Sequence, residues 1–301
     1  MMKHAIAIDI GGTNTRVALV DEKYEIIDRR QFATDSKNPD ATLDQIAAIV
    51  NGYEEELVGV GMSCPGPIDL IAGKVLTPPN LTDGWHNYPI SEELSKRIHG
   101  LPVYLNNDAN LACLAEAVIG EGKDYRFVQY FTVSTGLGAG FVIDKEIYIG
   151  AHGFANEVEN SIMIQDGPSH GSIIAGGIEA ISSGTAITVR AQKAGLDVAH
   201  AGEVNDLAKA GNETAKQIMD DAKNYLANYI AIVYAYADPE IVILGGSVAL
   251  KIDGFAEEVE ALVKEKIHYD VMVPYIKVRK STLNEDSGLL GAACLAFSKQ
   301  K

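Results

Sequence analysis

Asp9-Ile10-Gly11-Gly12-Thr13-Asn14 lies between two apolar runs, Ala5–Ile8 and Val17–Val20. This pattern predicts a strand that ends in a tight glycine turn and returns as a second strand. Glycines without side chains let backbone N–H groups approach a bulky anion, and the last two residues of the segment add hydroxyl and amide donors. Asp9, at the strand end, is placed to face Mg²⁺ or its water shell. The segment therefore suits a nucleotide phosphate, and an ordinary hairpin with a glycine turn is the alternative.

A second segment repeats this plan in the middle of the chain. Thr132–Gly140 is rich in glycine and threonine, Phe141–Ile143 continues as an apolar strand, and Asp144-Lys145-Glu146 makes a charged turn. The first motif is followed in the same way by an apolar strand and the charged turn Asp21-Glu22-Lys23. The matched order indicates an internal duplication. Two related halves, each with a phosphate-binding hairpin, predict a nucleotide held between two domains.

The composition is typical of a cytoplasmic enzyme with α/β domains. The 301 residues are 47% apolar, yet no stretch reaches the roughly 20 apolar residues of a membrane span. The N-terminus enters a strand without a signal-peptide pattern, and three cysteines lie far apart in apolar contexts, as reduced core residues do: Cys64, Cys113 and Cys294. A net charge of −16 without a basic cluster argues against nucleic acid or a membrane as partner. A bound polyphosphate would then rely on Mg²⁺ and backbone donors rather than on an arginine patch.

The rest of the chain alternates between strand and helix patterns. The predicted strands cover 58–63, 101–105 and 240–244, and the predicted helices cover 111–119, 213–237, 254–267 and 284–297. A Pro-Gly-Pro loop follows the first of these strands, and the domain break is expected near Gly120–Lys123.

Taken together, these motifs resemble the ROK family (repressors, open reading frames and kinases) of the actin-like ATPase superfamily. The resemblance runs essentially from end to end, and the number and order of its motifs make it specific. The matching segments are Asp9–Asn14, Pro65-Gly66-Pro67, Pro79-Asn80-Leu81 with Gly84-Trp85, Asn107–Asn110, Ser134–Gly140, Gly150–Glu157, Ile178-Glu179-Ala180 with Ser183-Gly184, and Leu244–Ser247.

The resemblance implies two actin-like ATPase (ribonuclease H-like) α/β domains, each built on a mixed five-stranded sheet, with the active site in the cleft between them. Residues 1–120 with 285–301 would form the smaller N-terminal domain, to which the terminal helix returns, and residues 121–284 the larger domain. A homodimer through the larger domain is the usual assembly in this family.

The resemblance also implies transfer of the ATP γ-phosphoryl group to a hexose hydroxyl, most often the 6-hydroxyl. A sugar hydroxyl is a poor nucleophile, so a carboxylate must take its proton, and Asp108 matches the catalytic base of the family. The alternative role for Asp108 is a helix cap, although Asn106 or Asn107 could do the capping.

The family pattern assigns the remaining site residues. Sugar-binding residues would be Gly66, Asn80, Asn107, Asp108, Glu157, Asn160 and Glu179. Nucleotide-binding residues would be Asp9, Gly11, Gly12, Thr13, Asn14, Thr135, Gly136, Gly138, Gly245, Gly246 and Ser247, with Asp9 facing Mg²⁺ through water. Trp85, the only tryptophan, could stack on a sugar or pack in the core.

The chain departs from the family at its structural zinc site. Many members bind zinc through one histidine and three cysteines, but Asn160 stands at the histidine position here. The cysteine positions hold His170, Ser172 and Gly177, so a zinc site is not expected. Segment 160–177 would then be mobile, or held by packing of Ile162, Met163, Ile164, Ile173 and Ile174. Asn160 also leaves the choice of sugar open among glucose, N-acetylmannosamine, fructose and β-glucosides.

Three functions are compatible with these motifs. The first is an ATP- and Mg²⁺-dependent hexose kinase, for which all key acids are present. The second is a transcriptional repressor of the same family, which the eight residues before Asp9 and the negative charge disfavour. The third is a non-catalytic sugar sensor, which the retained Asp108 and both phosphate motifs disfavour.

Overall fold

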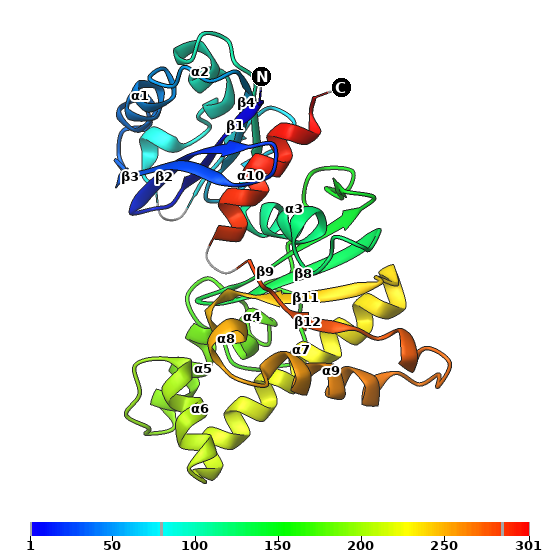
Figure 1. Cartoon of the computed structure of the whole chain (residues 1–301). Coiled ribbons are helices and arrows are strands. Elements are labelled where there is room, and N and C mark those ends of the chain that lie inside the picture. Colours follow the sequence, from blue (N-terminus) through cyan, green and yellow to red (C-terminus); the bar gives the residue numbers. More distant parts are fainter. Residues whose placement is uncertain (1, 79–80, 284–285, 301) are drawn as a thin grey trace. The chain divides into compact units, whose positions relative to one another are not determined.

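A computed structural model describes residues 2–78, 81–283 and 286–300. The chain divides into two compact units, which are shown in Figure 1. Unit 1 comprises Met1–Ile119, Ile149–Gly153 and Glu285–Lys301. Unit 2 comprises Gly120–Tyr148 and Phe154–Asn284. The sequence did not indicate that the short segment Ile149–Gly153 belongs with unit 1.

Within the described residues, unit 1 is built on a five-stranded mixed sheet of order β3-β2-β1-β4-β7. The strands are β1 (His4–Ile10), β2 (Asn14–Asp21), β3 (Ile26–Ala33), β4 (Leu57–Ser63) and β7 (Val103–Asn106). β2 runs antiparallel to both of its neighbours, β1 and β3, whereas β1, β4 and β7 run parallel. The carboxyl ends of these three parallel strands therefore meet at one edge of the sheet.

The helices of unit 1 cover its sheet and complete its core. They are α1 (Pro39–Val50), α2 (Ile90–Arg97), α3 (Asp108–Ile119) and α10 (Ser287–Ser298), with the short elements β5 (Ile68–Asp69), β6 (Lys74–Val75) and η1 (Asp83–Trp85). Trp85 is fully buried in this core, and its indole N–H donates to the backbone oxygen of Asp35 at 3.0 Å. It is therefore a core residue and does not stack on a sugar.

The terminal helix α10 packs against β4 and α3 through small residues. A Cβ atom on Gly61 of β4 would lie 1.8 Å from the carbonyl oxygen of Ala292. A Cβ atom on Gly291 would lie 1.9 Å from the carbonyl oxygen of Leu111 in α3. Only glycine fits at these two backbone contacts, so the Gly/Ala-rich composition of α10 is required by its close approach.

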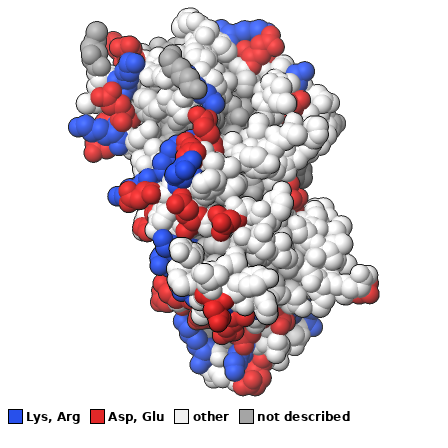
Figure 2. Space-filling view, turned by 90° about the vertical axis from the view of Figure 1, so that its right-hand side faces the viewer, with Lys and Arg blue, Asp and Glu red and all other residues white. Residues whose placement is uncertain are grey.

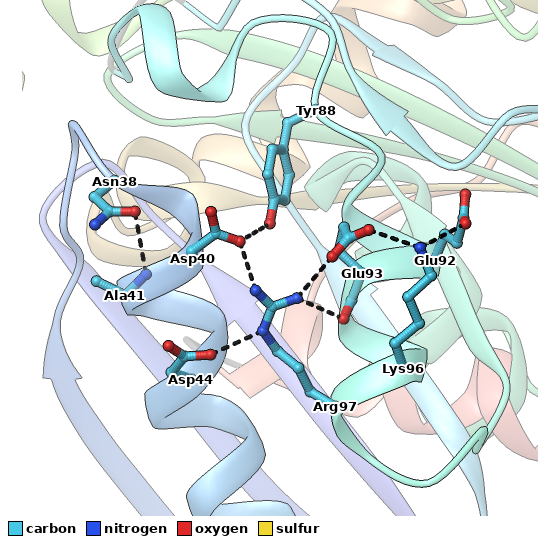
Figure 3. A network of polar contacts seen from close by, with 9 residues as sticks. All are labelled: Asn38, Asp40, Ala41, Asp44, Tyr88, Glu92, Glu93, Lys96 and Arg97. Atoms are coloured by element: carbon cyan, nitrogen blue, oxygen red, sulfur yellow. Dashed lines mark hydrogen bonds and ion pairs between the residues drawn. The ribbon is translucent and has the colours of Figure 1, made fainter.

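A polar network joins α1 to α2 on the surface of unit 1 (Figure 3). Arg97 forms ion pairs with Asp40 and Asp44 of α1, at 2.5 and 2.8 Å, and with Glu93 of its own helix at 2.9 Å. The Tyr88 hydroxyl donates to Asp40 at 2.5 Å. Because one guanidinium serves three carboxylates, this network holds the two helices in a defined orientation.

Unit 2 repeats the strand order of unit 1. Within the described residues, its five-stranded sheet has the order β10-β9-β8-β11-β12. The strands are β8 (Phe127–Val133), β9 (Leu137–Ile143), β10 (Glu146–Ile147), β11 (Ile241–Gly245) and β12 (Val278–Lys280). β8 and β9 form an antiparallel hairpin, and β8, β11 and β12 run parallel, as the corresponding strands of unit 1 do. This equivalence agrees with the internal duplication, and the expected mixed five-stranded sheets are confirmed.

The helices of unit 2 pack into a second apolar core. They are α4 (Glu179–Ser182), α5 (Gly184–Lys193), α6 (Ala201–Lys209), α7 (Glu213–Ala237), α8 (Gly246–Lys251) and α9 (Phe255–Lys266), with the turn η2 (Val273–Tyr275). The prediction of α7 is correct at both ends, because the Asn212 side chain caps its start and Asp238 adopts the left-handed conformation before a proline. Other predicted boundaries move by one to three residues; α3 begins at Asp108 rather than at residue 111.

Candidate active site

The first glycine motif forms the predicted hairpin at the carboxyl end of β1. Gly11 N–H donates to the backbone oxygen of Asn14 at 2.9 Å, which closes the turn, and Thr34 N–H donates to that of Thr13 at 2.9 Å. Gly12 lies within the same turn, so the backbone donors and small side chains of the motif are presented together.

Asp9 pairs across the hairpin with Arg16, a residue that the sequence argument missed. The two are direct neighbours in the β1–β2 register, and the Arg16 guanidinium lies 2.6 Å from Asp9 Oδ2. Both side chains are mostly buried, with exposed fractions of 28% and 21% for Arg16 and Asp9. An arginine therefore lies beside the glycine turn, and the expectation that no arginine patch holds the phosphates stays a prediction. The period-two alternation of the hairpin was the signal that could have found this residue.

The carboxyl edge of the unit 1 sheet brings three predicted segments together. Asp9 is in register with Ser63 of β4, and Ser63 is in register with Asn106 of β7. The loop that contains Gly66 directly follows β4, and the pair Asn107-Asp108 directly follows β7. These residues therefore lie at one edge, where ligands bind in sheets of this kind.

The start of α3 separates the roles of Asn107 and Asp108. The Asn107 side-chain oxygen accepts the N–H of Asn110 at 2.7 Å and so caps the helix. Asn106 accepts the N–H of Asn107 at 2.9 Å and the Asn110 amide at 3.0 Å. Since the asparagines do the capping, Asp108 is available for chemistry, although its Oδ1 also accepts the N–H of Ala109 at 2.9 Å.

The environment of Asp108 favours its protonated form more than water does. Although the residue is exposed, partial loss of hydration raises the pKa of Asp108 above its ordinary value. The negative charge of Asp9 raises the pKa further, whereas the N–H of Ala109 acts in the opposite direction. A raised pKa makes the carboxylate a stronger base toward a hydroxyl proton.

The remaining predicted residue of unit 1 lies outside the described residues. Asn80 belongs to segment 79–80, so its place relative to the other predicted site residues is not described. The neighbouring residues are tied down, because Thr82 N–H donates to the backbone oxygen of Ser36 at 2.8 Å and Leu81 N–H donates to that of Pro78 at 3.3 Å.

The second glycine motif forms the corresponding hairpin in unit 2. Ser134 N–H donates to the backbone oxygen of Gly136 at 2.9 Å, and Gly138 pairs with Thr132 in the β8–β9 register. The side chain of Glu179, the first residue of α4, accepts the N–H of Leu137 at 2.8 Å. The structure thus places a predicted sugar-binding carboxylate directly against a predicted phosphate-binding turn.

The turn after β11 lies next to this hairpin. Gly245 is in register with Thr132, and the hydroxyl groups of Ser134 and Ser247 are 3.1 Å apart. Gly246 has a φ of +81°, and a Cβ atom there would lie 2.6 Å from the backbone oxygen of Val133. Glycine at position 246 is therefore required by the close contact between the two turns.

A cavity of about 690 Å³ opens beside these two turns within unit 2. Its size is in the range of small-molecule sites. The polar residues that line it include Thr135, Thr185, Thr188, His200, Ser247 and Lys251. Only Thr135 and Ser247 of these were predicted. The Ser183-Gly184 motif was the available signal for the others, because Ser183 caps α5 and Gly184 N–H donates to the backbone oxygen of Ser134 at 2.6 Å.

Segment 160–177 is held only partly by the expected packing. Ile162, Ile164 and Ile174 are exposed, whereas Met163 is half-buried and packs against the core of unit 2. In addition, the Asn160 side-chain oxygen accepts the N–H of Ile174 at 3.0 Å, and Met163 N–H donates to the backbone oxygen of Gly176 at 2.8 Å. Hydrogen bonds across the segment thus act together with the packing of Met163.

The predicted residues of this segment lie on irregular backbone in unit 2. Glu157 and Asn160 are both exposed, and neither belongs to a helix. In the part of the chain that the structure describes, no three His, Cys, Asp or Glu side chains form a group that could hold a metal ion. Across residues 2–78, 81–283 and 286–300, no helix combines the length and apolarity that crossing a bilayer requires.

Comparison with known proteins places these features in context. A model of the ROK family matches residues 5–299. The N-acetylmannosamine kinase of Salmonella heidelberg (strain SL476) is 35% identical over 295 residues, which cover 97% of this chain and 97% of that protein.

Two solved structures share the fold over almost the whole chain. The ROK hexokinase from Thermus thermophilus matches with a TM-score of 0.88 at 27% identity, covering 98% of both chains. The ROK family glucokinase from Streptomyces griseus in complex with glucose and AMPPNP matches with a TM-score of 0.76 at 27% identity, covering 98% of this chain and 99% of that one. The expected α/β fold of actin-like ATPase type is thereby confirmed.

Proposed function

The chain belongs to the ROK family, and we propose that it is an ATP-dependent sugar kinase whose acceptor is N-acetylmannosamine or a related hexose. The enzyme is a phosphotransferase with a sugar alcohol group as acceptor, as its relatives over nearly the full length are. The Asn107-Asp108 pair at the start of α3 carries the proposal, because its asparagine caps the helix and leaves the carboxylate for the substrate.

Asp108 is the proposed general base. Its carboxylate takes the proton of the sugar hydroxyl as the bond to phosphorus forms, and the raised pKa of Asp108 suits this transfer. The helix N-terminus stabilises the charge of the carboxylate before the transfer. Gly66, Asn107, Glu157, Asn160 and Glu179 are the proposed sugar ligands, together with Asn80.

The cavity of unit 2 is the proposed adenosine site. Val189, Val248 and Ile252 supply apolar surface for a purine, while Thr185 and His200 supply polar groups. The hairpin turns at 11–14 and 134–138 are the proposed phosphate sites, because their backbone N–H groups and hydroxyls can face the triphosphate.

Magnesium is the proposed metal. The residues fit it, because Asp9 offers a hard carboxylate oxygen beside the glycine turn and would hold the ion through water. When bound, Mg²⁺ neutralises charge on the phosphates. Arg16 fixes the Asp9 side chain through its ion pair and adds a positive charge next to the turn.

A coupled assay of ADP release tests the activity and the choice of sugar. We expect turnover with Mg²⁺ and ATP in a panel that contains N-acetylmannosamine, N-acetylglucosamine, glucose, mannose and fructose, with N-acetylmannosamine giving the highest kcat/KM. Asp108→Asn serves as the matched control for background ATP hydrolysis. Absence of sugar-dependent ADP release across the panel would contradict the kinase and favour the non-catalytic sensor.

We further propose that the enzyme is a homodimer through unit 2. The end of α7 and the segment that follows α9 expose large apolar side chains: Ile232, Tyr236, Tyr269, Val271 and Tyr275. The lower part of Figure 2, which shows unit 2 from the side where α7 ends, has a wide area without charged residues. Each copy carries a net charge of −16, so two copies repel each other least when they meet through a face without charged residues. Tyrosine, which is frequent among these exposed side chains, is also enriched in protein interfaces. Light scattering should show a dimer for the wild type and a monomer for Val271→Asp; a monomeric wild type would contradict the proposal.

A further inference from the structure

Glu179 connects two parts of unit 2 that the sequence treats as separate sites. Its Oε2 accepts the N–H of Leu137, the first residue after the glycine turn of the second hairpin, at 2.8 Å. Its own N–H donates to the backbone oxygen of Glu159 at 3.2 Å, in the loop that carries Glu157 and Asn160. Glu179 is therefore fixed by the sugar-site loop on its backbone side and by the phosphate hairpin on its carboxylate side.

Gly136 provides the space for this carboxylate. A Cβ atom on Gly136 would lie 2.7 Å from Glu179 Oε2, 3.4 Å from its Cδ and 3.7 Å from Oε1, and these are the three nearest heavy atoms. The φ of Gly136 lies outside the left-handed region, so the backbone accepts alanine there without strain. The absence of a side chain at position 136 therefore serves the placement of Glu179 rather than a turn conformation.

Thr135, the preceding residue of the same turn, has different neighbours. It lines the cavity of about 690 Å³, and its backbone oxygen accepts the N–H of Thr185 at 3.4 Å. Two consecutive residues of one glycine motif thus face two different sites: position 135 belongs to the nucleotide cavity and position 136 adjoins the carboxylate of Glu179.

We infer that Gly136 and the N–H of Leu137 are positioning elements of the sugar site, which hold Glu179 in the conformation that binds the acceptor. This inference rests on the proposed sugar kinase function. In this arrangement, Oε2 of Glu179 keeps its hydrogen bond to the N–H of Leu137, and Oε1 accepts a hydrogen bond from a sugar hydroxyl. The hydrogen bond to a charged acceptor is strong enough to restrict a flexible glutamate side chain to one orientation before the sugar arrives.

Binding measurements on Gly136→Ala and Thr135→Ala test the inference. Calorimetry would measure N-acetylmannosamine, or the preferred sugar of the panel, without nucleotide, and AMPPNP with Mg²⁺ without sugar. We expect Gly136→Ala to weaken sugar binding about tenfold and AMPPNP binding by a clearly smaller factor, because the Cβ displaces the end of the Glu179 side chain while the backbone N–H groups of the turn remain. We expect Thr135→Ala to show the opposite pattern.

A double-mutant cycle separates positioning from a general loss of structure. In a Glu179→Ala background the added Cβ has no carboxylate to displace, so Gly136→Ala should weaken sugar binding no further. Gly136→Ala should melt only slightly below the wild type, because the displaced side-chain end loses one hydrogen bond and the backbone keeps its conformation.

The possible results distinguish this inference from the proposed function. A wild type that binds none of the sugars overturns both. Normal sugar binding by the wild type, with unchanged sugar affinity in Gly136→Ala, overturns the positioning role alone. Additive losses in the cycle, or a tenfold loss of AMPPNP affinity in Gly136→Ala, would show that this glycine serves the hairpin itself.

Discussion

Replacing Gly291 by alanine should loosen the packing that holds the helix of Asp108 in unit 1. The new Cβ would lie 1.9 Å from the carbonyl oxygen of Leu111 in α3, whereas ordinary contact begins at about 3.4 Å. The two helices would therefore have to separate by roughly 1.5 Å. Because the partner is backbone, no rotamer change relieves the contact, and overpacking of this kind costs about 3 kcal/mol.

Alanine also stabilises a helix relative to glycine by about 1 kcal/mol, which reduces the net loss to roughly 2 kcal/mol. Trp85 is the only tryptophan and is fully buried in the core of unit 1, so its fluorescence reports the unfolding of that unit. We expect the urea midpoint of Gly291→Ala to fall by roughly 1 M. We also expect kcat to fall severalfold, since α3 carries Asp108.

Gly288→Ala is the matched control on the same helix. No heavy atom lies within 4 Å of a Cβ at Gly288, so alanine there meets no neighbour. Its urea midpoint should equal or exceed that of the wild type. Equal midpoints for the two variants would refute the argument that close backbone contact, rather than helix composition, requires glycine at position 291.

Three further predictions concern the candidate site. Asp108→Asn should lower kcat by about 10² to 10⁴ while sugar affinity changes little, and a variant that keeps more than about a tenth of wild-type kcat would exclude Asp108 as the base. Loss of hydration and the charge of Asp9 raise the pKa of Asp108 above the ordinary 3.8. Because a general base must be deprotonated to act, kcat/KM should fall as the pH decreases through this raised pKa. A pH profile of kcat/KM that stays flat down to pH 4 would contradict this. Arg16→Met should lower the free energy of unfolding of unit 1 by about 1 kcal/mol, because the mostly buried Asp9 loses its partner, and Arg16→Lys should retain part of this stabilisation. Trp85 fluorescence in urea measures the stability of both variants, and an unchanged midpoint for Arg16→Met would show that the ion pair does not stabilise the unit.

Much of the fold follows from local sequence patterns. Glycine turns between apolar runs predict both hairpins, since a turn and its strands depend on residues close together in the chain. The long helix α7 is predicted at both ends, because its apolar spacing runs from residue 213 and the Asp-Pro pair after residue 237 ends the helix within one turn. The second motif repeats the first, so the duplicated strand order is also readable from sequence.

The sequence assigns candidate site residues but not their contacts. Asp108 can be named from its motif, yet whether it caps α3 depends on hydrogen bonds that Asn106 and Asn107 form instead. The Asp9–Arg16 pair depends on strand register, which places the two residues opposite each other. The stability of segment 160–177 depends on hydrogen bonds that its apolar composition does not reveal.

The sequence by itself determined the two related α/β halves, the glycine turns and the acids that the chemistry requires. Tertiary structure alone decided that Glu179 contacts Leu137, 42 residues away in the chain, and that His200 of the α6 start shares a cavity with Thr135. The physical reason is that turns and helix ends are set by neighbours in sequence. A carboxylate beside a distant N–H, or a cavity between helices, exists only after separate elements have packed together.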